Sequence, residues 1–306
     1  MIKAYTLNLP DVLIVMGVIL FWTAALWRTL NLITSIEARK KLKKEGLEDS
    51  SSAAPFDPHK ELGKNNVSYA VQRSSLAGAQ VIALLATIDS FDGDNRLDSF
   101  IWMMVQGLWV FVALIVSRHV VDWIVLPKIK NHELLLQNNG AVAAVEAGSY
   151  LGLGFNVAAS LTGDAPNLAL SIASTIGFYV LGLALVLLFF WLHELFTPYN
   201  VRTLIEEGNV RAGIDAGSII LAMSIVVSVG VAGDFTTWGD GIKALGLTTI
   251  ISVALLYPCW LLLNVFGPGQ RDLSMRKQDC VAPAIVSGSF LVLAGFGVAA
   301  AVSTVL

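Results

Sequence analysis

Eight long apolar stretches constrain this 306-residue chain more than any other feature. Each approaches or exceeds the roughly 20 apolar residues that a helix needs to cross a bilayer core of about 30 Å. Charged residues make up only 14% of the chain, against about 25% in a typical soluble domain. The sequence therefore predicts an all-α polytopic membrane protein. We place its eight transmembrane helices at residues 11–33, 67–88, 100–124, 140–162, 168–196, 209–232, 243–266 and 280–305.

A ten-residue pattern recurs at the start of every second apolar stretch. Residues 209–218 (NVRAGIDAGS) and 140–149 (GAVAAVEAGS) are two copies, and residues 66–75 (NVSYAVQRSS) and 280–289 (CVAPAIVSGS) are two more. Such a period indicates repeated structural units, each containing two spans here. We therefore expect four parallel helical-hairpin repeats, arranged in a ring or side by side. They are grouped as two four-helix domains, 1–163 and 164–306.

The charges of the connections predict an orientation. Only Lys3, Arg96 and Lys243, among the 20 Lys and Arg residues, lie on the side of the connections after the second, fourth and sixth spans. Because positive residues stay on the cytoplasmic side, both termini are predicted to face the exterior or periplasm.

The first basic connection, residues 37–65, is the longest. Its run from Arg39 to Lys44 can attract anionic lipid, or can act simply as a topology signal. A Ser, Ala and Pro stretch at 50–55 predicts a linker. In the third basic connection, Val201, Leu204 and Ile205 share one face of a predicted short interfacial helix. Leu134–Leu136 suggest a similar design in the second basic connection.

Two acids in the recurrent pattern are the main candidates for function. Glu146 and Asp215 lie at the same pattern position, where the other copies have Gln72 and Val286. An acid against lipid is costly, so each should face protein or water. We interpret them as a cation or proton site between the two halves. The alternative is a satisfied buried group or an acid that reaches the interface.

The two acids differ in their local partners. Arg211 lies four residues before Asp215 and can pair with it on one helix face. Val142 is at the corresponding position before Glu146, which therefore has no such partner.

Small residues at four-residue spacing predict close helix packing. The acids lie roughly 200° away from these glycines on the helix, so we expect them to face a different surface. The predicted packing positions are Gly78, Gly148, Gly152, Gly213, Gly217 and Gly288.

Polar groups at helix ends suggest a route for protons. His119 and His193 should lie near the level of the acids and can link them to water, or can serve as interface anchors. Asn156, Ser224 and Ser228 lie deeper, where we expect interhelical hydrogen bonds.

Motifs for nucleotide binding, metalloprotease activity or serine hydrolysis do not occur, and the four histidines lack metal-ligand spacing. We therefore expect no enzyme activity, no metal and no cofactor. The basic connections are explained by topology, so we expect no nucleic-acid partner.

The third and fourth units resemble the YjfL-like bacterial inner-membrane family, domain of unknown function 350 (UPF0719). Its members are typically four-helix proteins with two repeats, so the chain resembles a tandem fusion of two. The resemblance implies the bacterial inner membrane and homo-oligomers, but no reaction. Departures are the basic insertion in the first unit and the missing acid in the fourth. The resemblance rests on Thr197, Pro198, Asn200, Leu204, Ile205, Asn209, Ala212, Gly217 and Ser218.

Two functional hypotheses follow. The first is a cation or proton channel or transporter that uses the intramembrane acids. The second is a non-transporting scaffold or envelope-stress component that recruits peripheral proteins or anionic lipid through its basic face.

Overall fold

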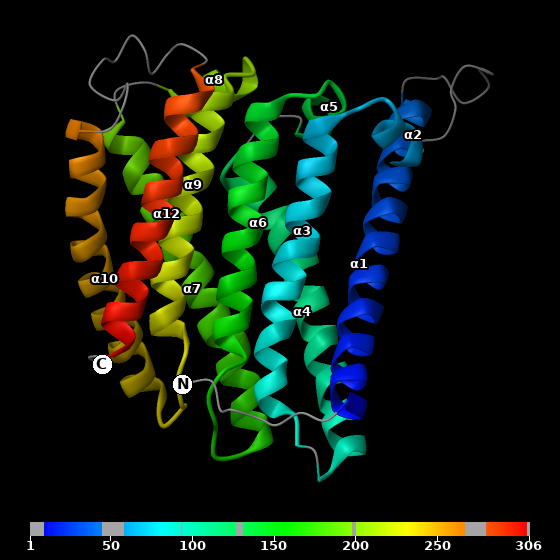
Figure 1. Ribbon diagram of the computed structural model, residues 1–306, viewed down its shortest axis with the longest axis vertical. Helices are drawn as coiled ribbons and strands as arrows, with labels where there is room; N and C mark the ends of the chain where they lie inside the picture. The colour runs from blue at the N-terminus through cyan, green and yellow to red at the C-terminus, as the bar shows by residue number, and fades with distance from the viewer. Residues whose placement is uncertain are drawn as a thin grey trace.

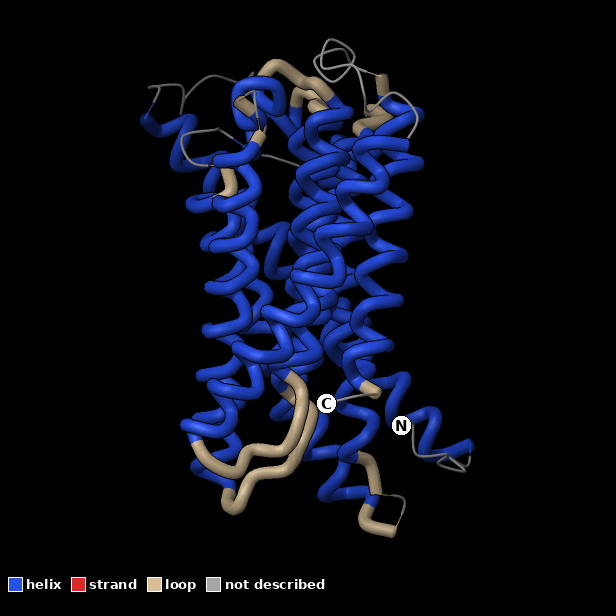
Figure 2. Tube along the Cα trace, turned by 90° about the vertical axis from the view of Figure 1, so that its left-hand side faces the viewer, coloured by secondary structure: helices blue, strands red, loops and turns tan. Residues whose placement is uncertain are grey.

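The computed structural model describes residues 9–44, 58–92, 94–126, 131–197, 200–266 and 280–304. All the elements in these ranges are helices, as Figure 2 shows, and eight of them are long and apolar enough to cross a membrane. The predicted all-α membrane fold with eight spans is confirmed. The spanning helices are α1 (Leu9–Lys44), α3 (Val67–Leu85), α4 (Arg96–Ile124), α6 (Gly140–Ser160), α7 (Leu168–Phe196), α9 (Val210–Val231), α10 (Trp238–Phe266) and α12 (Val281–Ser303).

Helix α1 is longer than predicted, because it continues from residue 33 to Lys44. No Gly or Pro interrupts this stretch, and Lys, Arg, Glu and Leu are good helix formers. The side chains of the basic run from Arg39 to Lys44 lie outside the described residues, as do the predicted linker at 50–55 and Pro198.

The spanning helices form two layers. Helices α3, α6, α9 and α12 stand side by side in the front layer, and all four begin at the same end of the molecule (Figure 1). Behind them, α4 packs on α3 and α6, α7 on α6 and α9, and α10 on α9 and α12, while α1 packs on α3 and α4. The helices therefore form a row instead of a ring.

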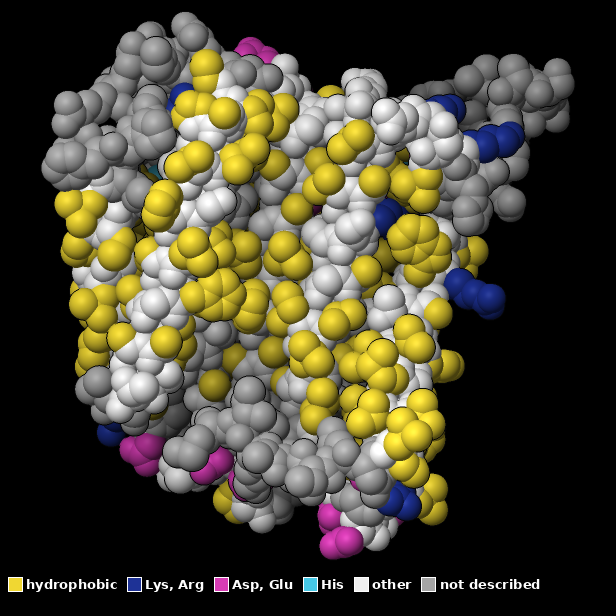
Figure 3. All heavy atoms as spheres, viewed as in Figure 1, with side chains coloured by type: hydrophobic (Ala, Val, Ile, Leu, Met, Phe, Trp, Pro, Cys, Tyr) yellow, Lys and Arg dark blue, Asp and Glu magenta, His cyan; other side chains and the backbone are white. Residues whose placement is uncertain are grey.

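The two ends of the molecule differ in character. Three short helices, α2 (Pro58–Gly63), α5 (Asn131–Leu136) and α8 (Val201–Glu206), lie at the end that we call the basic end. The two short helices predicted around Leu134–Leu136 and Val201 are thus present. Figure 3 shows hydrophobic side chains over the middle of one face of the molecule. Acidic side chains gather at the end opposite the basic end, which we call the acidic end.

Three of the four front helices start in the same way. Asn66, Asn139 and Asn209 cap α3, α6 and α9 by accepting hydrogen bonds from backbone N–H groups of the first turn. The residue before each cap has positive φ, which reverses the chain direction after each short helix. In the second copy, the cap lies one residue before the start of the aligned pattern.

The same asparagines join neighbouring repeats at the basic end. Asn66 Nδ2 donates to the Leu135 carbonyl at 2.9 Å, and Asn139 Nδ2 donates to the Ile205 carbonyl at 3.1 Å. Each cap therefore also satisfies a carbonyl at the end of the next short helix.

The two halves of the chain meet between α6 and α9, where glycines bring the backbones together. A Cβ at Gly148 would fall on the Gly217 backbone, and one at Gly213 would fall on Ala141. Gly152 lies against Ser224, while Gly78 and Gly288 lie against Leu151 and Ser218 respectively. Small residues at these positions permit this close approach.

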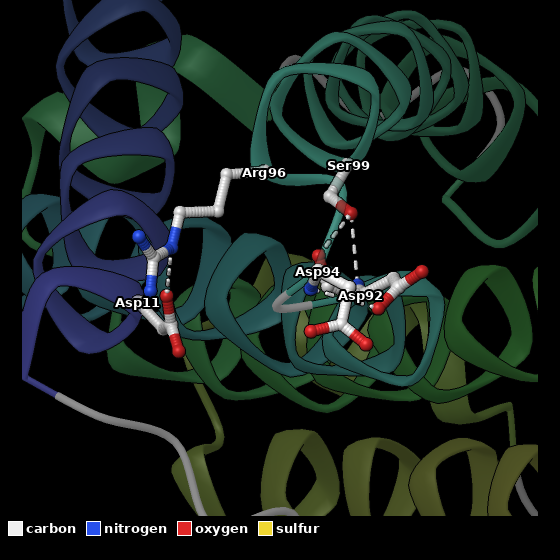
Figure 4. Close-up of polar contacts among 5 residues, drawn as sticks. All are labelled: Asp11, Asp92, Asp94, Arg96 and Ser99. Carbon is white, nitrogen blue, oxygen red and sulfur yellow. Dashed lines mark hydrogen bonds and ion pairs between the residues drawn. The ribbon is translucent and has the colours of Figure 1, made fainter.

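Polar contacts also join helices at the acidic end. Arg96 of α4 pairs with Asp11 of α1 at 2.8 Å, and Ser99 accepts from the Asp92 backbone N–H at 2.8 Å (Figure 4). Between the loop after α6 and the loop after α9, the Asp164 N–H donates to the Asp234 carboxylate at 2.8 Å.

Candidate functional site

The two pattern positions of the first half meet in the core. Gln72 of α3 donates from Nε2 to Glu146 Oε2 of α6 at 2.6 Å. The Glu146 side chain is fully enclosed, with the residue 1% exposed, and Gln72 is 3% exposed. Glu146 has no partner one turn earlier on its own helix, where Val142 stands, and its hydrogen-bond donor comes from another helix. The sequence analysis expected a cation or proton site between the two halves. The Gln72–Glu146 contact instead lies inside the first half.

A buried guanidinium compensates the Glu146 carboxylate. Arg118 of α4 is 5% exposed and interacts electrostatically with both Glu146 and Asp122. Its Nε lies 3.9 Å from Asp122 Oδ2, and Asp122 also accepts from Asn131 Nδ2 at 3.0 Å. Arg118 thus lies between one acid in the core and a second acid near the basic end.

A second buried arginine lies nearby. Arg73 of α3 donates from Nη2 to Thr34 of α1 at 2.8 Å, and its guanidinium stacks over the Tyr69 ring at 4.9 Å. Arg73 also interacts electrostatically with Arg118. This part of the core therefore contains two arginines, of which Arg118 interacts with Glu146.

The polar cluster continues to the basic end through α5. His132 is half-buried there and interacts electrostatically with Glu37 and Arg118. Burial lowers the pKa of His132 below its ordinary value, so its imidazole is neutral at pH 7. A neutral imidazole can both accept and donate a proton.

From Glu146, a stripe of polar side chains runs along α6 toward the acidic end. Glu146, Ser149, Asn156 and Ser160 fall within an arc of about 80° on the helix, at roughly 100° per residue. All four are buried. They span about 21 Å along the helix axis at 1.5 Å per residue.

Gln80 of α3 lies at about the height of Gly154 of α6, between the levels of Ser149 and Asn156. It is fully buried, and its neighbour Ala79 packs against α6, where a Cβ at Gly154 would lie 2.7 Å from the Ala79 carbonyl. We call Glu146, Ser149, Gln80, Asn156 and Ser160 the polar column.

Most of the polar column has unmet hydrogen-bonding capacity. Glu146 interacts with the buried Tyr150 hydroxyl as well as with Gln72. Ser149 Oγ and both amide atoms of Gln80 and Asn156 are buried without a hydrogen-bond partner in the part of the chain that the structure describes. The expected interhelical hydrogen bond of Asn156 is therefore not formed there. Each such atom costs about 1–3 kcal/mol if nothing compensates it.

The polar column ends at a cavity near the acidic end. The cavity has a volume of about 920 Å³, lies between α4 and α7, and is lined in part by Ser160, Phe178 and Val231. Asn156 lies just below it, because a Cβ at Gly182 would touch both the Asn156 amide and Val231.

The acid of the second half, Asp215 of α9, has different surroundings from Glu146. Asp215 lies 3.8 Å from Arg211 on the same helix, as the sequence predicted, and its side chain is 24% exposed. Ser224 and Ser228 donate to the carbonyls of Ile220 and Ile225 on their own helix. The interhelical hydrogen bonds expected of these two serines are wrong, because a hydroxyl in a helix can return to its own preceding turn.

The two candidate histidines lie apart from each other. His119 is exposed, although it follows the buried Arg118 directly. His193 packs edge-on against Trp260 of α10, with ring centroids 5.7 Å apart, and approaches the Thr197 hydroxyl. His132, which the sequence analysis did not select, is the histidine beside the Arg118 cluster.

Sequence reasoning also missed Arg73 and Gln80, although a usable signal was present. Tyr69, Arg73 and Gln80 share one face of α3, within about 40° at roughly 100° per residue. Polar residues on one face of a membrane helix mark a protein-facing or water-facing surface. Among the described residues, no group of three or more His, Cys, Asp or Glu side chains can hold a metal ion.

Comparisons with known proteins fit this architecture. The model of the family described as Domain of Unknown Function (DUF350) matches the chain twice, at residues 50–161 and 167–302. A UPF0719 transmembrane protein from Mycolicibacterium paratuberculosis is 25% identical over 129 residues, which cover 42% of this chain and 85% of the relative. No solved structure matches the chain.

Proposed function

This chain belongs to the DUF350 family of membrane proteins, and on that premise we propose that it carries protons across the bilayer through the first half. The observation that supports the proposal is the polar column, which links a buried acid to a cavity at the acidic end. Water molecules satisfy such groups in proteins, typically with two to four hydrogen bonds each. A hydrated column of this kind provides the hydrogen-bonded path that a proton needs.

Glu146 is the proton-binding group in this proposal. An ionised carboxylate out of water requires a nearby cation or a proton, and Glu146 has access to both. When Glu146 is ionised, Arg118 compensates its charge. When a proton binds Glu146, Arg118 still pairs with Asp122. The arginine therefore has an acidic partner whether Glu146 is ionised or protonated.

The positive surroundings favour a proton over a metal cation. Arg118 would repel a second positive ion at Glu146, whereas a proton neutralises the acid covalently. Of the two ions that the sequence analysis proposed, a metal cation or a proton, we therefore propose the proton. Gln72 contributes the hydrogen bond that fixes the carboxylate toward α3.

The route has two ends of different chemistry. At the basic end, Glu37, Asp122 and His132 exchange protons with water and deliver them to Glu146. At the other end, the proton leaves through Ser149, Gln80 and Asn156 into the cavity. Under the positive-inside rule, we place the basic end on the cytoplasmic side of a bacterial inner membrane. Two further predictions from the sequence are that the protein forms homo-oligomers and that the run from Arg39 to Lys44 binds anionic lipid.

The test is proton flux into liposomes loaded with a pH-sensitive dye, driven by a potassium diffusion potential. Wild-type protein should acidify the lumen, and Glu146→Gln should lower the rate by about tenfold or more, because the proton-binding group is removed. Replacing sodium with a bulky organic cation should leave the rate unchanged. A wild-type rate equal to that of protein-free liposomes would refute the proposal.

A further inference from the structure

The cavity at the acidic end is open to the bilayer as well as to the polar column. Its lining includes Trp102, Val105 and Leu108 of α4, and Ile172 and Ile176 of α7, all of which are exposed on the molecular surface. These helices face lipid, so the cavity is accessible from the membrane. Its volume of about 920 Å³ falls within the range of about 300–1,000 Å³ for small-molecule sites.

The two ends of the cavity differ in polarity. The side between α4 and α7 is mainly apolar and aromatic, with the small polar residues Ser171, Ser174 and Thr175 and the longer Gln106 among them. The end at the loops contains Asp164, Asn167 and Asp234. Lys, Arg and His are absent from the described lining. The cavity therefore combines a slot for an apolar chain with an acidic end at the membrane boundary.

We propose that this cavity binds a phospholipid with a primary ammonium headgroup. One acyl chain lies between α4 and α7, and the ammonium group lies beside the Asp164 and Asp234 carboxylates. The aromatic face of Trp102 is suited to the same cation. A purely anionic headgroup would face two like charges, and the acidic loops disfavour it.

The contacts of the two acids suggest different roles. Asp234 Oδ1 accepts from the Asp164 backbone N–H, so it also holds the loop after α6 to the loop after α9. The Asp164 side chain is exposed at the cavity end. Asp164 is therefore the residue whose charge can be removed with the least disturbance of the fold.

The lipid proposal does not rest on proton transport, although the proposed proton route ends in the same cavity, and lipid retention and proton flux are measured separately. The experiment is native mass spectrometry of the full chain after equilibration in mixed micelles with equal phosphatidylethanolamine and phosphatidylglycerol. Wild-type protein should retain one phosphatidylethanolamine, preferred by about tenfold. Asp164→Asn should reduce the preference to about threefold or less.

Two further variants define the site. Ile176→Trp places bulk in the chain slot and should reduce retention of both lipids, while its unfolding temperature in detergent reports whether the fold is intact. Asp240→Asn removes an acid at the same end that does not line the cavity, and it should behave as wild type. Equal retention of the two lipids by wild type, or an unchanged preference in Asp164→Asn, would overturn the proposal.

Discussion

Helices α6 and α9 begin with the same sequence pattern and pack against each other, yet they bury different chemistry. Aligned on Glu146 and Asp215, both helices have a serine three residues later. Asn156 and Ser160 of α6 then correspond to Ile225 and Val229 of α9. Two substitutions thus end the polar stripe in the second half, while the shared glycines preserve the backbone contact. The repeat determines how the helices pack, and its variable positions determine which half contains a polar path.

The two acids show the same division. Glu146 is fully enclosed and depends on Gln72 and Arg118 from two other helices. Asp215 is partly exposed and pairs with Arg211 one turn earlier on its own helix. A charge that reaches the surface is partly solvated, whereas an enclosed one depends on its protein partners. Substitutions in the first half should therefore have larger consequences.

The largest effect on stability is expected for Arg118→Met. It leaves the Glu146 carboxylate in the core without a compensating cation, at a cost of about 3–5 kcal/mol. Adding Glu146→Gln should recover a large part of that loss. Arg211→Met should cost less, because Asp215 can reach solvent. Thermal unfolding in detergent measures all of these variants, and equal losses for the two arginines would remove the distinction between the halves.

A smaller loss is expected for Gln72→Leu. The substitution leaves Glu146 Oε2 without its donor, which costs about 1–3 kcal/mol, and proton flux should fall with it. The pseudo-equivalent Val286→Leu lies on an exposed face and should change stability by less than about 0.5 kcal/mol. If both variants unfold at the wild-type temperature, the Gln72 hydrogen bond has no energetic role.

Asn156→Leu should separate stability from transport. Removing an unsatisfied buried amide should leave stability unchanged or raise it by about 1 kcal/mol, while interrupting the column should reduce proton flux strongly. The reverse exchange, Ile225→Asn, buries a new amide in the second half and should destabilise the protein by about 1–3 kcal/mol. Wild-type flux in Asn156→Leu would show that protons do not pass this level.

Much of the architecture could be predicted from the sequence, because long apolar helices in a bilayer have few alternatives. The eight spans and the Arg211–Asp215 pair follow from local composition and helical spacing. The end of α1 did not follow, since its basic continuation is helical outside the apolar segment. The arrangement of the helices in a row could not be predicted from the sequence either, because repeated hairpins with the same local pattern can also form a ring.

The site was less accessible than the fold because its contacts are between helices. Gln72 and Glu146 lie 74 residues apart, and no local rule pairs them. Arg118 lies near the end of α4, where charged residues are usually exposed, although its side chain is buried in the core. Helical-wheel analysis of α3 and α6 for buried polar stripes would have found Gln80 and grouped Asn156 with Glu146.

The most direct test of the account compares the two acids under identical conditions. Proton flux in liposomes should fall by about tenfold or more for Glu146→Gln, and should stay close to the wild-type rate for Asp215→Asn at equal amounts of reconstituted protein. Equal losses in the two variants, or a loss confined to Asp215→Asn, would contradict the claim that Glu146, and not Asp215, is the proton-binding group.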